Sequence, residues 1–415
     1  MECKSKIKVG VIGGGAAGMM AAVTAATQGA SVTLLEGGER VGRKILSTGN
    51  GKCNLGNLNL SASHYYGAQT EWIQECLSCF GSKDTIDFFS GIGLMIKEKN
   101  GYLYPLSEQA SSVLDVLRTE LRTRGVEVVT EAKVNSVAKT EAGDFFVNAG
   151  EQRFRFDKVI LACGSKAAPK TGSDGSGYKL AKSLGHHLIP TVPALVQLRC
   201  GENYLKEVAG VRVDARIVVV FPKSGEEITE RGELQLTDYG ISGIPVFQLS
   251  RRVNYLLRDM GKNGEVEVSI DLLPELSGEA FAQLCVMRKK LQDNKTVEEF
   301  FTGMLNKKLM LLFIKLAGLK REAMAKDIKD WQLQAVFDLC KDWRLHVTGS
   351  NSYDNAQVCA GGVDTAWVDA RMESRLVPGL YFAGELLDVD GRCGGYNLHW
   401  AWCSGYLAGH NAAGQ

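Results

Sequence analysis

Three glycines near the N-terminus, Gly13, Gly15 and Gly18, follow one another in the spacing GxGxxG. An acid, Glu36, stands 18 positions beyond the last of them. Glycines in this spacing permit a tight turn, a close approach of the backbone to a pyrophosphate, and close packing of a helix on a strand. A carboxylate at this distance can accept hydrogen bonds from the hydroxyl groups of an adenosine ribose. The pattern predicts a dinucleotide site, provided that a strand precedes the glycines and a helix follows them.

The residues around the glycines have the patterns that such a site needs. The run from Lys8 to Ile12 is rich in Val and Ile, which is typical of a buried parallel strand. Ala16 to Thr27 predicts an Ala-rich helix, whose N-terminus would offer free N–H groups and a positive dipole end to phosphate. A second strand is predicted from Val32 to Leu35, so that Glu36 stands at its end. This order favours a Rossmann-type fold over a plain structural turn.

NAD and FAD share this fingerprint, and segments far along the chain favour FAD, because its flavin end must be enclosed at a distance from the adenine. Val41 to Asn57 is too rich in Gly, Asn and Ser for a regular element. The sequence "PGLYFAGE" predicts a strand that ends at Gly384 and Glu385, where ligands of parallel sheets bind. Gly391, Gly394 and Gly395 then crowd into one turn, and a glycine cluster usually lets something lie against the backbone.

Composition limits the alternatives. The 415 residues include 48 basic and 47 acidic ones, a formal net charge of +1, which gives no support to a broad nucleic-acid surface but leaves a local basic patch open. The start "MECKSKIKVG" is not a secretory signal, and the longest apolar run, Leu309 to Ile314, is too short to span a bilayer. We expect a cytoplasmic protein that acts without nucleic acid or membrane; the oligomeric state stays open.

The eleven cysteines show no metal-ligand spacing, so we expect reduced thiols and no metal site. The pair Cys76 and Cys79 falls in a helical pattern and predicts two partly buried helix cysteines. Cys53 stands where flavin disulfide reductases begin a CxxxxC pair, but the partner position is Leu58, so a dithiol reductase is disfavoured.

The patterns along the chain predict an insertion. A buried strand is expected at Val159 to Ala162, and beyond Pro190 short segments alternate apolar and polar residues, which indicates antiparallel sheet. From Ser277 to about Cys340 the period becomes helical. We predict a dinucleotide-binding domain over residues 1–190 and 359–415. Within it are inserted a β-barrel-like domain over 191–275, with a return strand at about 341–358, and a helical subdomain over 276–340.

The motifs "GRKILSTGNGKCN", "TGSDGSGYKLAKSLGH", "GELQLTDYGISG", "AGGVD" and "PGLYFAGELLDVDGRCGGYNLHWAWCSGY" occur in this order. In this order they resemble the BaiN-like (YhiN-like) family of FAD-dependent oxidoreductases. The resemblance covers essentially the whole chain. It implies an α/β fold, namely a glutathione-reductase-type Rossmann domain that holds FAD non-covalently, with the inserted barrel-like and helical parts. Cys163 and Arg392 depart from the family pattern, in which a threonine and an acidic residue are more common.

The resemblance also implies which residues contact FAD, mostly through their backbone. We expect the last turn to lie against the flavin ring, with a helix beginning near Leu398 that points at the pyrimidine edge. The expected cofactor-binding residues are Gly13, Gly14, Gly15, Ala16, Ala17, Gly18, Glu36, Gly37, Arg43, Lys44, Ser47, Gly49, Asn50, Gly51, Cys53, Asn54, Val134, Ala162, Cys163, Gly164, Gly384, Glu385, Asp388, Gly394, Gly395, Tyr396, Asn397 and Leu398.

No second GxGxxG unit follows a strand, so NAD(P)H would dock only transiently as electron donor. The leading hypothesis is an NAD(P)H-dependent flavin reductase or dehydrogenase of a small apolar substrate. The resemblance suggests an enone of steroid or bile-acid type. The alternatives are a flavin amine oxidase that uses dioxygen, similar to an aminoacetone oxidase, and an FAD-containing protein that acts on tRNA. The catalytic residues are not identified by the sequence; Arg392, Tyr396 and His399 are the candidates, and a redox role of Cys53 or Cys163 stays open.

Overall fold

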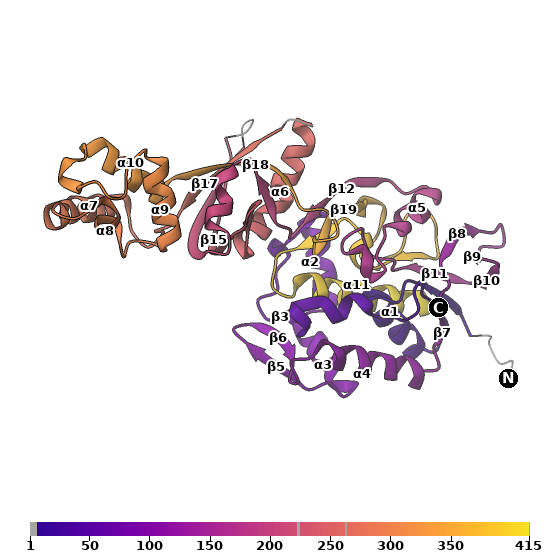
Figure 1. Ribbon diagram of the computed structural model, residues 1–415. Coiled ribbons are helices and arrows are strands. Elements are labelled where there is room, and N and C mark those ends of the chain that lie inside the picture. Colours follow the sequence, from indigo (N-terminus) through magenta and orange to yellow (C-terminus); the bar gives the residue numbers. More distant parts are fainter. Residues whose placement is uncertain (1–5, 222–224, 262–263, 415) are drawn as a thin grey trace. The chain divides into compact units, whose positions relative to one another are not determined.

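The computed structural model describes residues 6–221, 225–261 and 264–414, which form two compact units (Figure 1). One unit comprises Met1–Val192 and Ala356–Gln415, and the other comprises Pro193–Asn355. The buried apolar residues form two separate clusters, one in each unit. The second unit is thus an insertion with a core of its own. The insertion predicted from the sequence ran from residue 191 to about residue 358.

A five-stranded parallel sheet, in the order β20-β11-β1-β2-β7, is the centre of the first unit. Its strands are β1 (Lys8–Ile12), β2 (Ser31–Leu35), β7 (Glu127–Val129), β11 (Lys158–Leu161) and β20 (Leu380–Phe382). The strand predicted at Lys8 to Ile12 is confirmed, and four of its five residues are buried, as expected where helices cover both faces of a sheet. The predicted Rossmann-type α/β fold with an inserted barrel is therefore confirmed.

Two helices of the first unit pack closely on each other (Figure 1). The helix α1 (Ala16–Thr27) follows β1 at the residues predicted, and α11 (Tyr396–Ala413) lies along it. A Cβ at Gly405 would stand 2.4 Å from the Ala17 carbonyl oxygen, and one at Gly409 would stand 2.3 Å from that of Ala21. Two glycines four residues apart thus let the last helix touch the backbone of the first.

Smaller elements surround this core. They are the sheets β10 (Gln152–Phe156), β9 (Phe145–Ala149) and β8 (Val134–Lys139); β21 (Val389–Gly391) and β4 (Tyr65–Gly67); β3 (Gly56–Asn57), β6 (Tyr102–Pro105) and β5 (Ile96–Lys99); β12 (Leu188–Ala194) and β19 (Val358–Val363); and the helices α2 (Thr70–Cys79), α3 (Ser82–Gly91), α4 (Ala110–Thr123) and α5 (Ser176–Ser183). Cys76 is buried in α2 and Cys79 is exposed.

The second unit contains a closed barrel in the order β13-β16-β15-β14-β17-β18. Its strands are β13 (Leu198–Cys200), β14 (Arg212–Val220), β15 (Glu227–Leu236), β16 (Gly240–Ser242), β17 (Val266–Asp271) and β18 (Trp343–Ser350). Alternate residues of β14, such as Ala215, Ile217 and Val219, are buried, which is the period of a strand with one face toward a core. A helix that the sequence reading did not foresee, α6 (Ile244–Met260), follows β16; Pro245 stands in its first turn, where proline is favoured.

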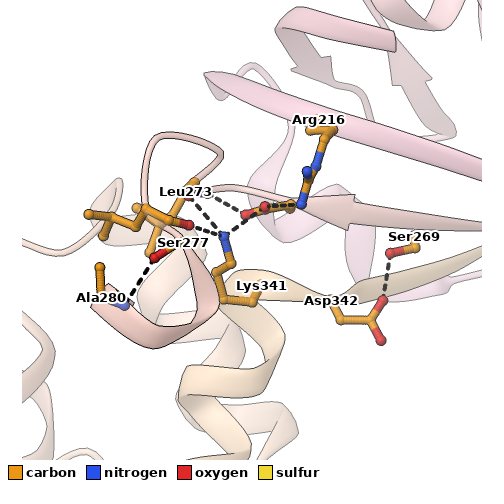
Figure 2. Close-up of polar contacts among 9 residues, drawn as sticks. Arg216, Ser269, Leu273, Ser277, Ala280, Lys341 and Asp342 are labelled. Atoms are coloured by element: carbon orange, nitrogen blue, oxygen red, sulfur yellow. Dashed lines mark hydrogen bonds and ion pairs between the residues drawn. The ribbon is translucent and has the colours of Figure 1, made fainter. Parts of the chain in front are cut away.

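The helical subdomain consists of α7 (Gly278–Gln292), α8 (Val297–Phe301), α9 (Lys307–Leu316) and α10 (Asp330–Lys341). A charged cluster joins it to the barrel (Figure 2). The Lys341 ammonium donates to the Asp271 carboxylate at 2.7 Å and to the carbonyl oxygens of Leu273 and Leu276 at 3.0 and 2.8 Å. Asp271, almost fully buried, also accepts from Arg216 at 2.9 Å. Each ammonium hydrogen thus has an acceptor, and the end of α10 is fixed to the end of β17.

Two local expectations were wrong. The segment from Val41 to Asn57 does hold a regular element, a 3-10 helix over Arg43–Gly51, which breaks where Thr48, Gly49 and Asn50 leave helical backbone angles. The last helix begins at Tyr396 rather than near Leu398, because Gly395 already adopts the cap position. Among the described residues, no helix is both long and apolar enough to cross a membrane.

Candidate dinucleotide site

The glycines of the turn after β1 and of the first turn of α1 have different surroundings. A Cβ at Gly13, where φ is +107°, would lie 2.5 Å from the Ala162 carbonyl oxygen, and one at Gly18 would lie 1.8 Å from that of Gly13. Both glycines are therefore required by the packing of strand and helix. A Cβ at Gly15 would meet no protein atom within 4 Å. Open space in front of Gly15, at the start of a helix, is the place for a pyrophosphate in such a fold.

Glu36 lies directly after β2, beside this turn. Its two carboxylate oxygens accept hydrogen bonds from the backbone N–H groups of Gly14 at 2.8 Å and Gly38 at 2.7 Å. These bonds fix the carboxylate next to the start of α1, and each oxygen keeps a lone pair for a ribose hydroxyl. Arg43 is another expected cofactor-binding residue. It donates to the Lys170 carbonyl oxygen at 2.7 Å, which joins the start of the 3-10 helix to the segment after β11.

Other expected residues line the ends of the strands. Ala162, Cys163 and Gly164 follow β11, and Gly37 follows Glu36. Val134 is buried at the start of β8, next to Lys133, which a Cβ at Gly37 would approach to 3.6 Å. Ala16 and Ala17 form the first turn of α1. All of these lie at the carboxyl edge of the sheet or beside it, apart from Val134 in the neighbouring sheet.

A second contact set joins the 3-10 helix to the end of β20. Lys44 and Glu385 form an ion pair at 2.7 Å between Nζ and Oε2, and Ser165 Oγ donates to the same carboxylate oxygen at 3.0 Å. Ser47 donates to the Lys44 carbonyl oxygen at 2.8 Å. Residues 341 positions apart thus meet in one place. In the same region, Gly49, Asn50 and Gly51 have positive φ angles, and a Cβ at Gly51 would meet no atom within 4 Å.

Three asparagine side chains hold the turn before α11. Asn57 Nδ2 donates to the Gly394 carbonyl oxygen at 3.1 Å. The Asn54 amide donates to the Gly56 carbonyl oxygen at 2.8 Å and accepts from the Gly395 N–H at 3.3 Å. The Asn397 amide makes two hydrogen bonds of 2.8 Å across the turn: its oxygen accepts from the Gly391 N–H, and its nitrogen donates to the Gly391 carbonyl oxygen. The sequence singled out Asn54 and Asn397 but missed Asn57, whose only signal was its place at the end of the Val41–Asn57 segment.

The glycines of this turn face protein atoms. A Cβ at Gly394 would lie 2.8 Å from the Tyr102 ring, and one at Gly395 would lie 2.6 Å from the Asn54 side-chain amide. Their φ angles are +120° and +93°, a region that glycine adopts at least cost. Close contacts within the chain and positive φ angles therefore explain why both positions are glycine. The α11 N-terminus carries no side-chain cap, so its first N–H groups stay available to a partner outside the helix.

The helix α11 also anchors the strand end at Gly384. Ser404 Oγ accepts from the Gly384 N–H at 2.9 Å, and Trp400 Nε1 donates to the Gly384 carbonyl oxygen at 3.3 Å. Asp388 is buried and accepts from the Gly361 N–H at 3.0 Å. Leu398 lies in the first turns of α11 and packs against the core. One helix therefore positions two of the expected cofactor segments.

The three candidate catalytic residues have different surroundings. His399 is fully buried, and its ring nitrogens contact Thr85 Oγ1 at 3.1 Å and the Phe80 carbonyl oxygen at 3.2 Å. Burial lowers the pKa of His399 to about 4, so the ring is neutral near pH 7. Tyr396 donates from its hydroxyl to the Asn59 carbonyl oxygen at 3.2 Å. Arg392 lies at the end of β21, and its N–H donates to the His64 carbonyl oxygen at 3.0 Å.

Two residues that the sequence reading missed lie at the same turn. The His64 ring contacts the Tyr396 ring at a centroid distance of 4.7 Å, and the Tyr65 hydroxyl donates to the Tyr396 carbonyl oxygen at 3.1 Å. Burial and the Arg392 guanidinium lower the pKa of His64. The pairing of β4 with β21 brings these residues to the turn, a contact for which the local sequence holds no signal.

The two cysteines of the site are thiols. Cys53 is fully buried, and burial raises its pKa to about 12; Thr48 provides a hydrogen bond. Cys163 donates from Sγ to the Ile12 carbonyl oxygen at 3.4 Å, and burial together with Glu36 raises its pKa to about 12. A thiol with a raised pKa is a poor nucleophile. Among the described residues, no group of three acids, histidines or cysteines is arranged to hold a metal ion.

The described residues fit the predicted FAD at both ends. The space at Gly15, the fixed carboxylate of Glu36 and the uncapped start of α11 are suited to a pyrophosphate, a ribose and a ring edge that gathers negative charge. Cys53 has no cysteine at the partner position of a CxxxxC pair, because residue 58 is leucine.

Comparison with known proteins identifies one family and three similar proteins. The family described as HI0933-like protein Rossmann domain matches residues 7–411. A 3-dehydro-bile acid Δ(4,6)-reductase of Clostridium scindens is 44% identical over 411 residues, 98% of this chain and 99% of the relative. A ribosomal RNA dihydrouridine synthase of Escherichia coli is 33% identical over 95% of each chain. Among solved structures, a 3-ketosteroid-Δ4-(5α)-dehydrogenase of Rhodococcus jostii RHA1 has a TM-score of 0.51 at 16% identity, covering 100% of this chain and 99% of that one, which shows a shared fold.

Proposed function

The chain belongs to the HI0933-like Rossmann family and is an FAD-dependent oxidoreductase, and we propose that it reduces a carbon–carbon double bond conjugated to a carbonyl group, with NAD(P)H as electron donor. The substrate we propose is a small apolar enone of steroid or bile-acid type. The observation that carries this proposal is the similarity to the bile-acid reductase, which extends over nearly the whole of both chains.

The residues of the cradle would divide the binding of FAD between them. The N–H group of Gly15 and the first N–H groups of α1 would hold the pyrophosphate, and Glu36 would hold the ribose. The free N–H groups at the start of α11 would face the pyrimidine edge of the flavin. Bound FAD would supply the redox chemistry, namely hydride transfer between NAD(P)H and the β-carbon of the enone.

The chain itself must then polarise the substrate carbonyl and provide a proton to the α-carbon. Arg392 is the residue that we assign to this part of the site, because it stands just before α11 and its guanidinium carries donors. Tyr396, whose hydroxyl donates to the Asn59 carbonyl oxygen, is the second candidate. His399 has no such role in our proposal, since its two ring nitrogens are engaged in the core and its ring stays neutral. Cys53 and Cys163 stay thiols throughout.

Anaerobic reduction of the purified holoenzyme tests the proposal. NADH or NADPH should bleach the flavin absorbance rapidly, and a 3-oxo-Δ4 steroid should then restore it, with the saturated ketone as product. Bleaching by a primary amine instead, with reoxidation by dioxygen, would establish the amine oxidase alternative. A flavin that nicotinamide does not reduce under saturating conditions would rule the proposal out.

A second candidate substrate is a uracil base in RNA. The relative from Escherichia coli is named for making dihydrouridine in ribosomal RNA, and the bond saturated in uracil is also a C=C conjugated to a carbonyl. One observation favours this candidate: residues 306–329 hold seven basic and two acidic residues, although the whole chain is nearly neutral. Mass analysis of RNA nucleosides after incubation with holoenzyme and NADPH, set against steroid turnover in the same preparation, separates the two substrates.

A further inference from the structure

Positive charge is concentrated in one part of the helical subdomain. The segment 306–329 consists of α9, the turn after it and a short 3-10 helix at Ala325–Asp327. All seven of its lysine and arginine residues are exposed. The chain as a whole carries a net charge of only +1, so this segment differs from the average surface. Local basic segments of this kind are the electrostatic sign of a polyanion partner.

A cleft of about 430 Å³ lies within this segment. Four cationic side chains line it, those of Lys308, Lys315, Lys320 and Arg321, together with Glu207 and Glu322. Its apolar side is formed by leucine and isoleucine side chains of α9 and the following turn. The cleft is therefore lined by exposed cationic side chains and by more buried apolar ones. Such a lining suits a ligand that has both charged and apolar parts.

The acids at the cleft neutralise only part of its charge. Lys315 pairs with Glu207 at 2.8 Å, and Arg321 pairs with Glu322 at 2.6 Å. Both pairs are exposed, and exposed ion pairs are weak enough to exchange for a stronger anion. Lys308 and Lys320 form no ion pair with another described residue. Two cations are thus free for an incoming phosphate, and two more can be recruited.

We propose that this basic cleft binds single-stranded RNA, with the phosphate backbone on the lysines and a base on the apolar side. Lys308 and Lys315 stand two turns apart on α9, about 10 Å along the helix. A charge row of that length fits an extended polyanion better than one free phosphate. The inference rests on the second candidate of the proposed function, the reduction of uracil in RNA.

An exposed aromatic residue in the same subdomain provides independent support. Trp331, at the start of α10, has 65% of its surface exposed, and it follows Lys329 by two positions. A single exposed apolar residue is common on protein surfaces, but an exposed indole close in sequence to basic residues offers a flat face on which a base can stack. Proteins that bind single strands combine a basic groove with aromatic rings on which bases stack. An acidic peptide would use the lysines but would gain little from Trp331, so the ring favours RNA.

The test is fluorescence anisotropy of the FAD-loaded protein with a labelled oligouridylate of about 20 nucleotides, over a series of salt concentrations. The variant Lys308→Gln/Lys320→Gln should weaken binding on the order of tenfold at 0.1 M salt, and should reduce the salt slope by about 1.4 for two lost phosphate contacts. Trp331→Ala should weaken binding about fivefold with an unchanged slope, and Trp331→Phe should restore it.

The control is Lys83→Gln/Lys99→Gln, two exposed lysines of the first unit, which should leave RNA binding unchanged. The inference fails if the wild-type protein does not bind the oligouridylate, if the control variant weakens binding as much as the cleft variant, or if polyglutamate of equal length competes as well as RNA. Steroid reduction by NADPH is measured with the same proteins. A wild-type protein that reduces the steroid but does not bind the oligouridylate rejects the cleft alone, whereas RNA binding without flavin reduction by nicotinamide rejects the proposed function alone.

Discussion

Two glycine clusters of the first unit, the one at Gly15 and the one before α11, differ in what lies beside their glycines. Around Gly15 a Cβ would meet no protein atom within 4 Å, whereas at Gly391, Gly394 and Gly395 it would meet one within 2.8 Å. In the first cluster Gly15 alone leaves room for something outside the chain, since Gly13 and Gly18 are packed against protein atoms. The second is filled by Asn54, Tyr102 and Tyr396. Both were interpreted from the sequence in the same way, as places where a ligand lies against the backbone.

The difference shows that glycine density identifies close approach but not the partner. Gly15 leaves space for a ligand, while Gly395 leaves space for the neighbouring loop, and only the structure separates the two cases. In the second cluster a role toward flavin would belong to the N–H groups of the first turn of α11 rather than to the glycine Cα atoms. The turn would then act as a rigid support that aims the helix. Four substitutions test this distinction, in order of expected effect.

The largest effect is expected from Gly395→Ala. An alanine at φ +93° costs roughly 1–2 kcal/mol of strain, and the overlap with Asn54 and the Gly56 carbonyl oxygen adds about 1–3 kcal/mol. The apparent melting temperature should fall by several degrees in the absence of added FAD. Gly185→Ala, at φ +89° with no atom in the way, is the control for strain alone and should cost less. Equal losses in the two variants would mean that the turn is not tightly packed.

Gly15→Val should affect the cofactor rather than the fold. The added methyl groups would enter the space expected to hold the pyrophosphate, so FAD affinity should fall at least about a hundredfold, near 2.7 kcal/mol. The melting temperature without added FAD should change little, since no protein atom is approached. Gly91→Val, also in open space but in α3, should retain its yellow colour. A Gly15→Val protein that keeps FAD through gel filtration would reject the phosphate position.

A third effect depends on pH and arises from His399, three residues into the helix after the second cluster. Its pKa is about 4 in the folded protein and 6.5 when the chain is unfolded, because burial disfavours the charged ring. The unfolded state therefore binds more protons between these values. The free energy of unfolding should therefore decrease by about 1.4 kcal/mol for each pH unit as the pH falls from 6.5 toward 4.

The measurement is denaturant unfolding at pH values from 7 to 4.5 for the wild-type protein and His399→Gln. Carboxylates contribute to both proteins, so the difference between the slopes is the quantity of interest. The variant should lose less stability on acidification. Parallel slopes would mean that His399 is hydrated or charged in the folded state, and would reopen its place among the candidate catalytic residues.

Much of the first unit could be predicted because its determinants are local. The strand β1, the turn at Gly13 and the helix α1 follow one another directly in the sequence, so their patterns are visible within one short segment. The alternation of the barrel strands was visible for the same reason. The helix α6 was not foreseen, since it lies between strand-like segments and begins after a glycine, Gly243, that also fits a strand turn.

The second cluster could not be resolved from the sequence because its partners are distant. Asn57 and Gly394 are 337 positions apart, and His64 reaches Arg392 only through the pairing of β4 with β21. Patterns of period 2 or 3.6 specify elements but not which loops meet. The expectation that this turn contacts the flavin ring included Asn54 and Asn397, but the sequence could not show that protein side chains occupy the space beside the glycines.

The smallest effect concerns the aim of α11 and is expected from Asn57→Ala. Proline at position 395 would be uninformative, because its φ of about −65° is incompatible with the +93° observed. Asn57→Ala instead removes the hydrogen bond from Nδ2 to the Gly394 carbonyl oxygen at 3.1 Å and the one that Oδ1 accepts from the Asn59 N–H at 2.9 Å, and it leaves the glycines in place. The start of α11 would then be held less firmly. Asn148→Ala, in strand β9 of the same unit, removes a comparable side-chain bond far along the chain and is the control.

If the helix points at the pyrimidine edge, its positive end stabilises the reduced, anionic flavin more than the oxidised one. A helix N-terminus contributes roughly 0.3–2 kcal/mol, and partial loss of that contribution, about 0.5–1 kcal/mol, lowers a two-electron midpoint potential by about 10–20 mV. Dye-equilibrated anaerobic titration at matched FAD occupancy measures the shift. An unchanged or higher potential in Asn57→Ala, with Asn148→Ala equal to wild type, would mean that the asparagines hold a turn that serves the packing of the chain and has no electrostatic part in the flavin site.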